Sequence, residues 1–139
     1  MKDTIYRLSS PEKQKVIRRL AEEIQSHEEV AFAYLYGTFI EDMPFHDVDV
    51  GIYLSGTGER HAGIFAVELA SKLTRLLELE VDVRVLNFAP VSFAYHVICG
   101  QVLFERSPED RVQFIESATH HYLDMKPLLY RAMKEAFAP

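Results

Sequence analysis

The spacing of apolar and polar positions along the chain predicts eight elements, in the order helix, strand, strand, helix, strand, helix, strand, helix. Short runs rich in β-branched and aromatic residues predict the strands, and apolar residues at helical spacing predict the helices. We expect strands over residues 30–37, 47–54, 79–88 and 101–105, and helices over 9–27, 59–79, 89–100 and from 107 onward. This order predicts an α/β fold in which helices cover a short mixed sheet.

Helix start signals support the first and last of these helices. Ser9 or Ser10 is followed by a proline and an acidic residue, which is typical of an N-cap and first turn. The same logic recurs with Ser107 as N-cap and Pro108 at the first helical position. Pro127 lies inside the terminal helix, and we expect it to kink that helix or split it in two.

Three helices carry apolar residues at helical spacing, and the stripe of the second helix is predicted to be buried. In the first and second helices these are Val16, Ile17, Leu20 and Ile24, and then Ile64, Leu69, Leu73 and Leu76. In the terminal helix the stripe is Val112, Ile115, Tyr122, Leu129 and Met133. A second set on the terminal helix can be either core or a surface for a partner, and consists of Tyr122, Met125, Leu128 and Leu129.

The length and composition indicate a protein with one core. The chain has 139 residues, of which 48% are hydrophobic and 26% are charged, and this predicts a single domain over residues 1–139. We expect the helical segment at about 107–138 to pack on this domain or on a partner. No apolar run approaches the roughly 18 residues of a membrane span, and the N-terminus is polar and carries acidic residues, unlike a signal peptide. A single cysteine, Cys99, excludes an intrachain disulfide and favours a cytoplasmic location.

The charge balance argues against a protein dedicated to nucleic-acid binding. The formal net charge is −6, and the chain has no run of four or five basic residues. Proteins that hold nucleic acid usually show a basic stripe. An acidic balance is compatible with a site for divalent cations, because such ions need carboxylate ligands.

Carboxylates interrupt two of the predicted strands. Because a strand has a period of two, Asp47 and Asp49 share one face, and Asp82 lies on the polar face of the next strand along the chain. Three bare carboxylates on neighbouring strands would repel one another, so we expect a hard divalent cation such as Mg²⁺ to compensate them. This pattern is typical of two-metal phosphoryl- or nucleotidyl-transfer sites. Arg84 shares the face of Asp82 and is expected either to pair with a carboxylate or to hold phosphates.

Gly37 and Thr38 lie at the end of the strand that precedes the two aspartates. A glycine lets backbone N–H groups approach an anion closely, and a threonine adds a hydroxyl donor. We therefore predict that Gly37 and Thr38 hold a triphosphate above metal ions that Asp47 and Asp49 bind.

This order of residues resembles the minimal nucleotidyltransferases (MNT) of the DNA polymerase β superfamily. The signature of that family is Gly-Ser, a variable loop, Asp-x-Asp, and a third carboxylate on a later strand. Gly37-Thr38, Asp47-Val48-Asp49 and Asp82 match it here. Residues 81–129 are also similar to the second half of the MNT proteins encoded beside HEPN-domain partners.

The resemblance implies a polymerase-β-like fold and a reaction with ATP and two Mg²⁺ ions. By analogy, Asp47 and Asp49 would bind both metals, and Asp82 would join them on the metal that activates the incoming hydroxyl. It further implies an antitoxin that transfers AMP from ATP to a tyrosine of a HEPN ribonuclease toxin, silences that toxin, and forms an oligomer with it.

Two departures from the family pattern leave alternatives open. Thr38 replaces the usual serine, and the loop "FIEDMPFH" is short and adds Glu41 and Asp42. The alternatives are a catalytically weak or inactive antitoxin that acts by binding, a nucleotidyltransferase for small molecules, and a ferredoxin-like interaction module.

Overall fold

A four-stranded mixed sheet forms the centre of the protein, as the computed structural model describes it for residues 4–137. The strand order is β3-β2-β1-β4. β1 (Val30–Tyr36) runs antiparallel to both β2 (Val48–Leu54) and β4 (Gln101–Glu105), whereas β3 (Val81–Val85) runs parallel to β2. The mixed sheet that the sequence predicted is confirmed.

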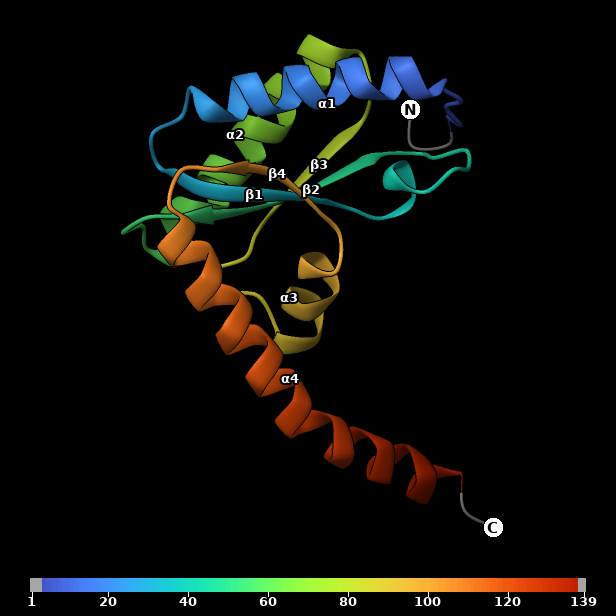
Figure 1. Ribbon diagram of the computed structural model, residues 1–139, viewed down its shortest axis with the longest axis vertical. Coiled ribbons are helices and arrows are strands. Elements are labelled where there is room, and N and C mark those ends of the chain that lie inside the picture. The colour runs from blue at the N-terminus through green and yellow to red at the C-terminus, as the bar shows by residue number, and fades with distance from the viewer. Residues whose placement is uncertain (1–3, 138–139) are drawn as a thin grey trace.

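Helices cover both faces of this sheet (Figure 1). α1 (Ser10–Gln25) and α2 (Glu59–Leu77) pack on one face, and α3 (Val91–Ile98) and the start of α4 (Pro108–Ala136) pack on the other. A short 3-10 helix, η1 (Thr38–Ile40), follows β1. The predicted order of helices and strands is confirmed, with η1 as an addition.

The start signals of α1 and α4 act as the sequence predicted. Ser9 is the N-cap of α1, and it forms a capping box in which Glu12 N–H donates to Ser9 Oγ (3.3 Å) and Ser9 N–H donates to Glu12 Oε1 (2.9 Å). Ser107 caps α4 by accepting from the N–H of Asp110 at 3.3 Å. Each cap satisfies backbone donors that a helix start leaves unpaired.

The core has two parts, one on each face of the sheet. Leu20 and Ile24 of α1 are fully buried. The predicted face of α2 is partly wrong, because Ile64 and Leu76 are 50% and 40% exposed. α2 instead faces the sheet with small residues, and its buried set at helical spacing is Ala62, Ala66, Leu69 and Leu73.

One arginine fastens the end of α1 to the start of β1. The guanidinium of Arg106 donates to three backbone oxygens, those of Gln25 (2.7 Å), His27 (3.2 Å) and Val30 (3.1 Å). The same group lies over the ring of Phe104, at 4.9 Å from the ring centre. This guanidinium therefore satisfies carbonyl groups where the chain leaves a helix for a strand.

α4 extends away from the rest of the protein (Figure 1). Ala118 is its one buried residue within the described chain. Of the apolar stripe, Ile115 and Tyr122 are half-buried, whereas Val112, Leu129 and Met133 are 47%, 45% and 63% exposed, so only its first half packs on the rest of the protein. Of the two outcomes expected at Pro127, the split is not observed, because the helix continues through this residue; its axis turns in the C-terminal part. Solvent can satisfy the carbonyl that proline leaves unpaired in this exposed segment. Within residues 4–137, none of the helices is both long enough and apolar enough to cross a bilayer.

Candidate active site

The three predicted carboxylates come together at one end of the sheet. Asp49 of β2 and Asp82 of β3 are partners in the parallel register, and Asp47 precedes Asp49 by two residues. Partners in register share a face, and so do residues two apart. The face is the one that α3 covers, because a Cβ on Gly51, the next residue of this face, would lie only 2.9 Å from Val97 Cγ1.

Burial and the proximity of the other two carboxylates raise the pKa of Asp49. The pKa of Asp49 is raised from 3.8 to about 6, first by burial and then by the charges of Asp47 and Asp82, whereas Arg84 acts in the opposite direction. The pKa of Tyr36 is raised by burial and by the charges of Asp49 and Asp82. The site therefore carries negative charge that the protein itself does not neutralise.

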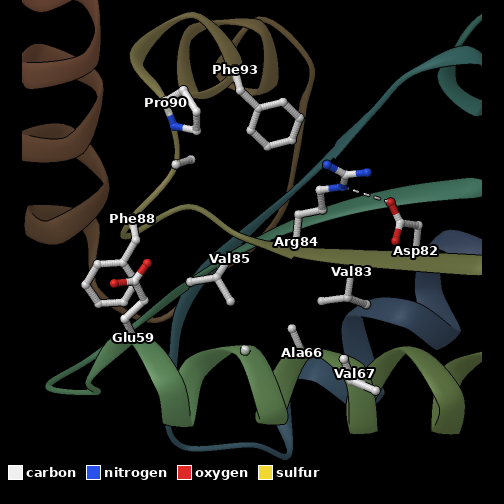
Figure 2. A pocket seen from close by; sticks show the side chains of 12 residues that line it. Glu59, Ala66, Val67, Asp82, Val83, Arg84, Val85, Phe88, Pro90 and Phe93 are labelled. Carbon is white, nitrogen blue, oxygen red and sulfur yellow. Dashed lines mark hydrogen bonds and ion pairs between the residues drawn. The ribbon is translucent and has the colours of Figure 1, made fainter.

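Arg84 is the one cation that contacts these carboxylates among the described residues. Its Nε donates to Asp82 Oδ2 at 3.1 Å, and its guanidinium lies over the ring of Phe93 at 5.6 Å from the ring centre (Figure 2). Of the two roles that the sequence allowed for Arg84, the ion pair is observed. Both side chains are solvent-exposed, at 61% for Arg84 and 41% for Asp82, so water or a ligand can compete for this pair.

Gly37 joins the predicted phosphate turn to the carboxylates. Its φ of +84° lies in a region that L side chains rarely adopt, and a Cβ at this position would overlap Asp49 Oδ2. The backbone of Gly37 therefore packs directly on the carboxylate of Asp49. Thr38 follows as the first residue of η1 and is exposed.

The short loop between Thr38 and Asp47 is anchored at both of its ends. Phe39 and Phe45 are buried, and their rings pack edge to face with centres 4.9 Å apart. Lys13 Nζ donates to the carbonyl oxygens of Phe39 (2.8 Å) and Glu41 (2.9 Å) and lies 5.3 Å from both ring centres. The sequence reasoning missed this anchor, although an aromatic residue at each end of the loop is a signal for it.

Tyr36 was also missed as a site residue. It pairs with Asp49 across the antiparallel β1–β2 ladder and immediately precedes the Gly-Thr turn. Its ring makes edge contacts with Phe93 and His96 of α3, with ring centres 5.6 and 5.8 Å apart. Tyr36 and α3 therefore form the apolar wall beside the carboxylates.

The donor set suits a magnesium ion that is shared with a phosphate ligand. Among residues 4–137, no group of three or more His, Cys, Asp or Glu side chains is arranged to hold a metal ion. Magnesium usually takes only one or two protein carboxylates and fills its other positions with water and substrate phosphates. The Asp47–Asp49 pair, with a carboxylate whose charge is uncompensated, meets that requirement.

A cleft of about 610 Å³ opens beside Asp82 (Figure 2). α2 forms one wall, the segment from Phe88 to Phe93 forms the other, and β3 forms the floor. Asp82 and Arg84 lie at one end of the cleft and Glu59 at the other. The cleft therefore leads along the sheet edge to the carboxylate cluster.

The sequence matches the family model described as "Polymerase beta, Nucleotidyltransferase" over residues 18–109. This range contains both ends of the site, from the Gly37 turn to Asp82. No curated protein gives a significant match to the sequence.

Several solved structures share the fold over nearly their whole length. One is a complex of a tri-AMPylated HEPN toxin with its MNT antitoxin from Shewanella oneidensis, with a TM-score of 0.72, 19% identity, and coverage of 91% of this chain and 99% of that one. A second is the MntA–HepT toxin–antitoxin, with a TM-score of 0.66, 21% identity, and coverage of 94% and 100%. A third is a toxin–antitoxin with AMP-PNP, with a TM-score of 0.68, 19% identity, and coverage of 94% and 100%.

Proposed function

Because this chain belongs to the polymerase beta nucleotidyltransferase family, we propose that it transfers AMP from ATP to a hydroxyl group of a partner protein. The observation that carries the proposal is the contact between the Gly37 turn and Asp49, a residue that lies close to both Asp47 and Asp82. A phosphate-binding turn that packs against a carboxylate cluster is what nucleotidyl transfer requires.

In this proposal the chain's own residues position the nucleotide. The backbone around Gly37 and the hydroxyl of Thr38 bind the triphosphate, and Asp47 and Asp49 hold the metal that it brings. Asp82 lies nearest the acceptor, where it would help to hold a metal ion and would accept a hydrogen bond from the incoming hydroxyl. When bound, Mg²⁺ neutralises phosphate charge and lowers the pKa of the acceptor hydroxyl.

One bond to phosphorus forms while another breaks. The acceptor oxygen forms a bond to the α-phosphorus of ATP, and the bond from that phosphorus to the α–β bridging oxygen breaks. Pyrophosphate leaves with the bonding electron pair, and the hydroxyl proton passes to solvent through the polar end of the cleft. Positioning and charge neutralisation supply most of the rate enhancement in such reactions.

We propose a HEPN-domain toxin as the acceptor and partner. The support is the shared fold with MNT antitoxins whose solved complexes contain HEPN toxins, one of them tri-AMPylated and one with AMP-PNP. The exposed apolar side chains at the end of α4 supply a contact surface for such a partner, and they are Leu123, Leu128, Leu129, Tyr130 and Met133.

The test is to identify the protein encoded beside this chain, which we expect to contain a HEPN domain, to incubate the two with ATP and Mg²⁺, and to measure the intact mass of the partner. We expect a gain of one or more AMP units, and we expect the double variant Asp47→Asn/Asp49→Asn to abolish the gain. Asp42→Asn is the matched control, because it removes an exposed carboxylate of the adjoining loop. An unchanged partner mass with the wild-type chain contradicts the proposed transfer.

Inhibition of the toxin by binding alone is the second candidate function, and the exposed apolar end of α4 favours it, because covering that surface needs no chemistry. In the same experiment this candidate predicts a stable complex and a silenced toxin with no change in mass. Deletion of residues 126–139 would then release the toxin, whereas the aspartate variants would not.

A further inference from the structure

We propose that the protein acceptor binds as an extended strand along the free edge of β3, in the cleft between α2 and α3. This inference rests on the proposed function, because it specifies how an acceptor segment reaches the carboxylates. It assigns the cleft to a segment with alternating side chains that carries its hydroxyl residue next to Asp82.

β3 is an edge strand, since it pairs with β2 on one side only. The direction of its backbone groups follows from two hydrogen bonds of 2.8 Å, from Val48 N–H to Glu80 O and from Leu86 N–H to Ile52 O. Backbone groups alternate in direction along a strand, so Asp82 and Arg84 direct theirs toward β2. Residues 81, 83 and 85 therefore direct their N–H and C=O groups away from the sheet.

One of these three residues is already paired, and two are not. Val81 N–H donates to Thr74 Oγ1 of α2 at 3.0 Å, and that hydroxyl lies 3.4 Å from Val81 O. This side-chain partner confirms that Val81 faces the free edge. For Val83 and Val85, no partner for the outward groups occurs within the described chain. Unpaired strand edges are templates for another strand.

The walls of the cleft suit the side chains of an added strand. Val67 of α2 is 71% exposed and Phe88 on the opposite side is 47% exposed. Both line the cleft, together with Pro90 and Phe93 above and Ala66 below (Figure 2). Side chains of an extended peptide alternate between its two faces, so successive residues would contact α2 and the Phe88–Phe93 segment in turn.

The floor of the cleft leads directly to the candidate active site. Asp82 lines the cleft and is also the register partner of Asp49. A strand that pairs with Val83 places one of its side chains beside Asp82, which is where the acceptor hydroxyl is needed. Glu59 adds a negative charge at the far end, away from the Arg84–Asp82 pair, so an acceptor with a basic residue at that end is favoured.

Amide hydrogen exchange tests the pairing without depending on transfer. The chain is mixed with its HEPN-domain partner in the absence of ATP, and exchange is compared for neighbouring residues of β3. We expect the amides of Val83 and Val85 to slow by at least about tenfold in the complex. The amides of Asp82 and Arg84, which already point to β2, are the internal control and should change little.

A pair of substitutions at Gly63 of α2 tests the cleft itself. Gly63 is exposed, and a Cβ at this position would meet no atom within 4 Å, so a side chain can start there without a clash. We expect Gly63→Phe to fill the cleft and to raise the KM for the acceptor at least about tenfold while ATP binding is unchanged. Gly63→Ala, the matched control, should behave like the wild type.

The outcomes separate this inference from the proposed function. If the complex forms and AMP is transferred while Val83 and Val85 exchange as before, the strand-addition proposal is overturned and the proposed function stands. If the complex forms without transfer and the two amides are protected, the edge is confirmed as the binding site and the transfer is overturned. If no complex forms, the HEPN assignment fails, and this inference fails with it.

Discussion

Removing the charge of Asp49 should stabilise the metal-free protein, although it should abolish transfer. The substitution Asp49→Asn keeps the size of the side chain and removes a negative charge that lies beside Asp47 and Asp82. Because burial and these neighbours raise the pKa of Asp49 from 3.8 to about 6, the ionised carboxylate is less stable in the folded chain than in the unfolded one.

The size of the effect follows from this pKa. One pKa unit corresponds to about 1.4 kcal/mol, so the shift sets an upper limit of about 3 kcal/mol on the stabilisation. Solvent reaches this half-buried carboxylate, and screening reduces the expected gain to about 1–2 kcal/mol. For a chain of this length the gain corresponds to a rise in Tm of about 3–6 °C.

The dependence on pH has a definite sign. The folded-state pKa lies above the unfolded one, so between these values the folded chain holds a proton that the unfolded chain has lost. The wild type therefore loses stability as the pH rises from about 4 to above 6, whereas Asp49→Asn does not take part in this change. The gain from the substitution should be complete at pH 7.5 and should vanish near pH 4.

The assay is chemical denaturation with a chelator present, at pH 7.5 and at pH 4, for the wild type, Asp49→Asn and Asp42→Asn. Asp42 is exposed, so its substitution should change the free energy of unfolding by no more than about 0.5 kcal/mol. Addition of Mg²⁺ and ATP should then stabilise the wild type more than Asp49→Asn. The reasoning is refuted if Asp49→Asn is less stable than the wild type at pH 7.5, or if its gain is equal at the two pH values.

Three further substitutions test the packing around the site and the terminal helix. Gly37→Ala should lower the free energy of unfolding by about 2–4 kcal/mol and abolish ATP binding, because the new Cβ overlaps Asp49. Gly56→Ala, also at positive φ but in open space, should lower it by only about 1 kcal/mol. Denaturation and ATP titration measure both variants, and equal losses of stability would exclude the overlap. Arg106→Lys should lose about 1–3 kcal/mol in denaturation, because an ammonium cannot bond the same three carbonyls; an unchanged stability would show that they need no guanidinium. Pro127→Ala should increase the helicity measured by circular dichroism and leave the denaturation midpoint of the core unchanged, since this segment is exposed. A large shift in that midpoint would contradict the exposure of α4 around residue 127.

The order of elements could be predicted because local signals agree with the tertiary fold. Ser9 and Ser107 mark helix starts, and the apolar runs at residues 30–36 and 48–54 form the buried strands β1 and β2. The buried face of α2 could not be predicted from such local signals. Ile64 outweighs Ala62 and Ala66 in hydrophobicity, but the alanines allow the helix to lie close to the sheet, and packing decides which residues are buried.

The site could be predicted in part for a similar reason. The period of a strand places Asp47 and Asp49 on one face, and this requires no knowledge of the fold. The register between Asp49 and Asp82, in contrast, depends on how two distant strands pair. The contacts of Lys13 with the loop carbonyls join residues 26 and 28 positions apart, and no local pattern specifies them.

The exposure of α4 bears on how this protein can change over evolutionary time. All described side chains from Lys126 onward are exposed, so substitutions there leave the buried core intact and cost little folding free energy. Substitutions near the carboxylates have no such freedom, because Gly37 and Gly51 leave no room for a side chain. The terminal half of α4 can therefore diverge rapidly or be exchanged between relatives, and a new partner preference can arise there without passing through an unstable intermediate.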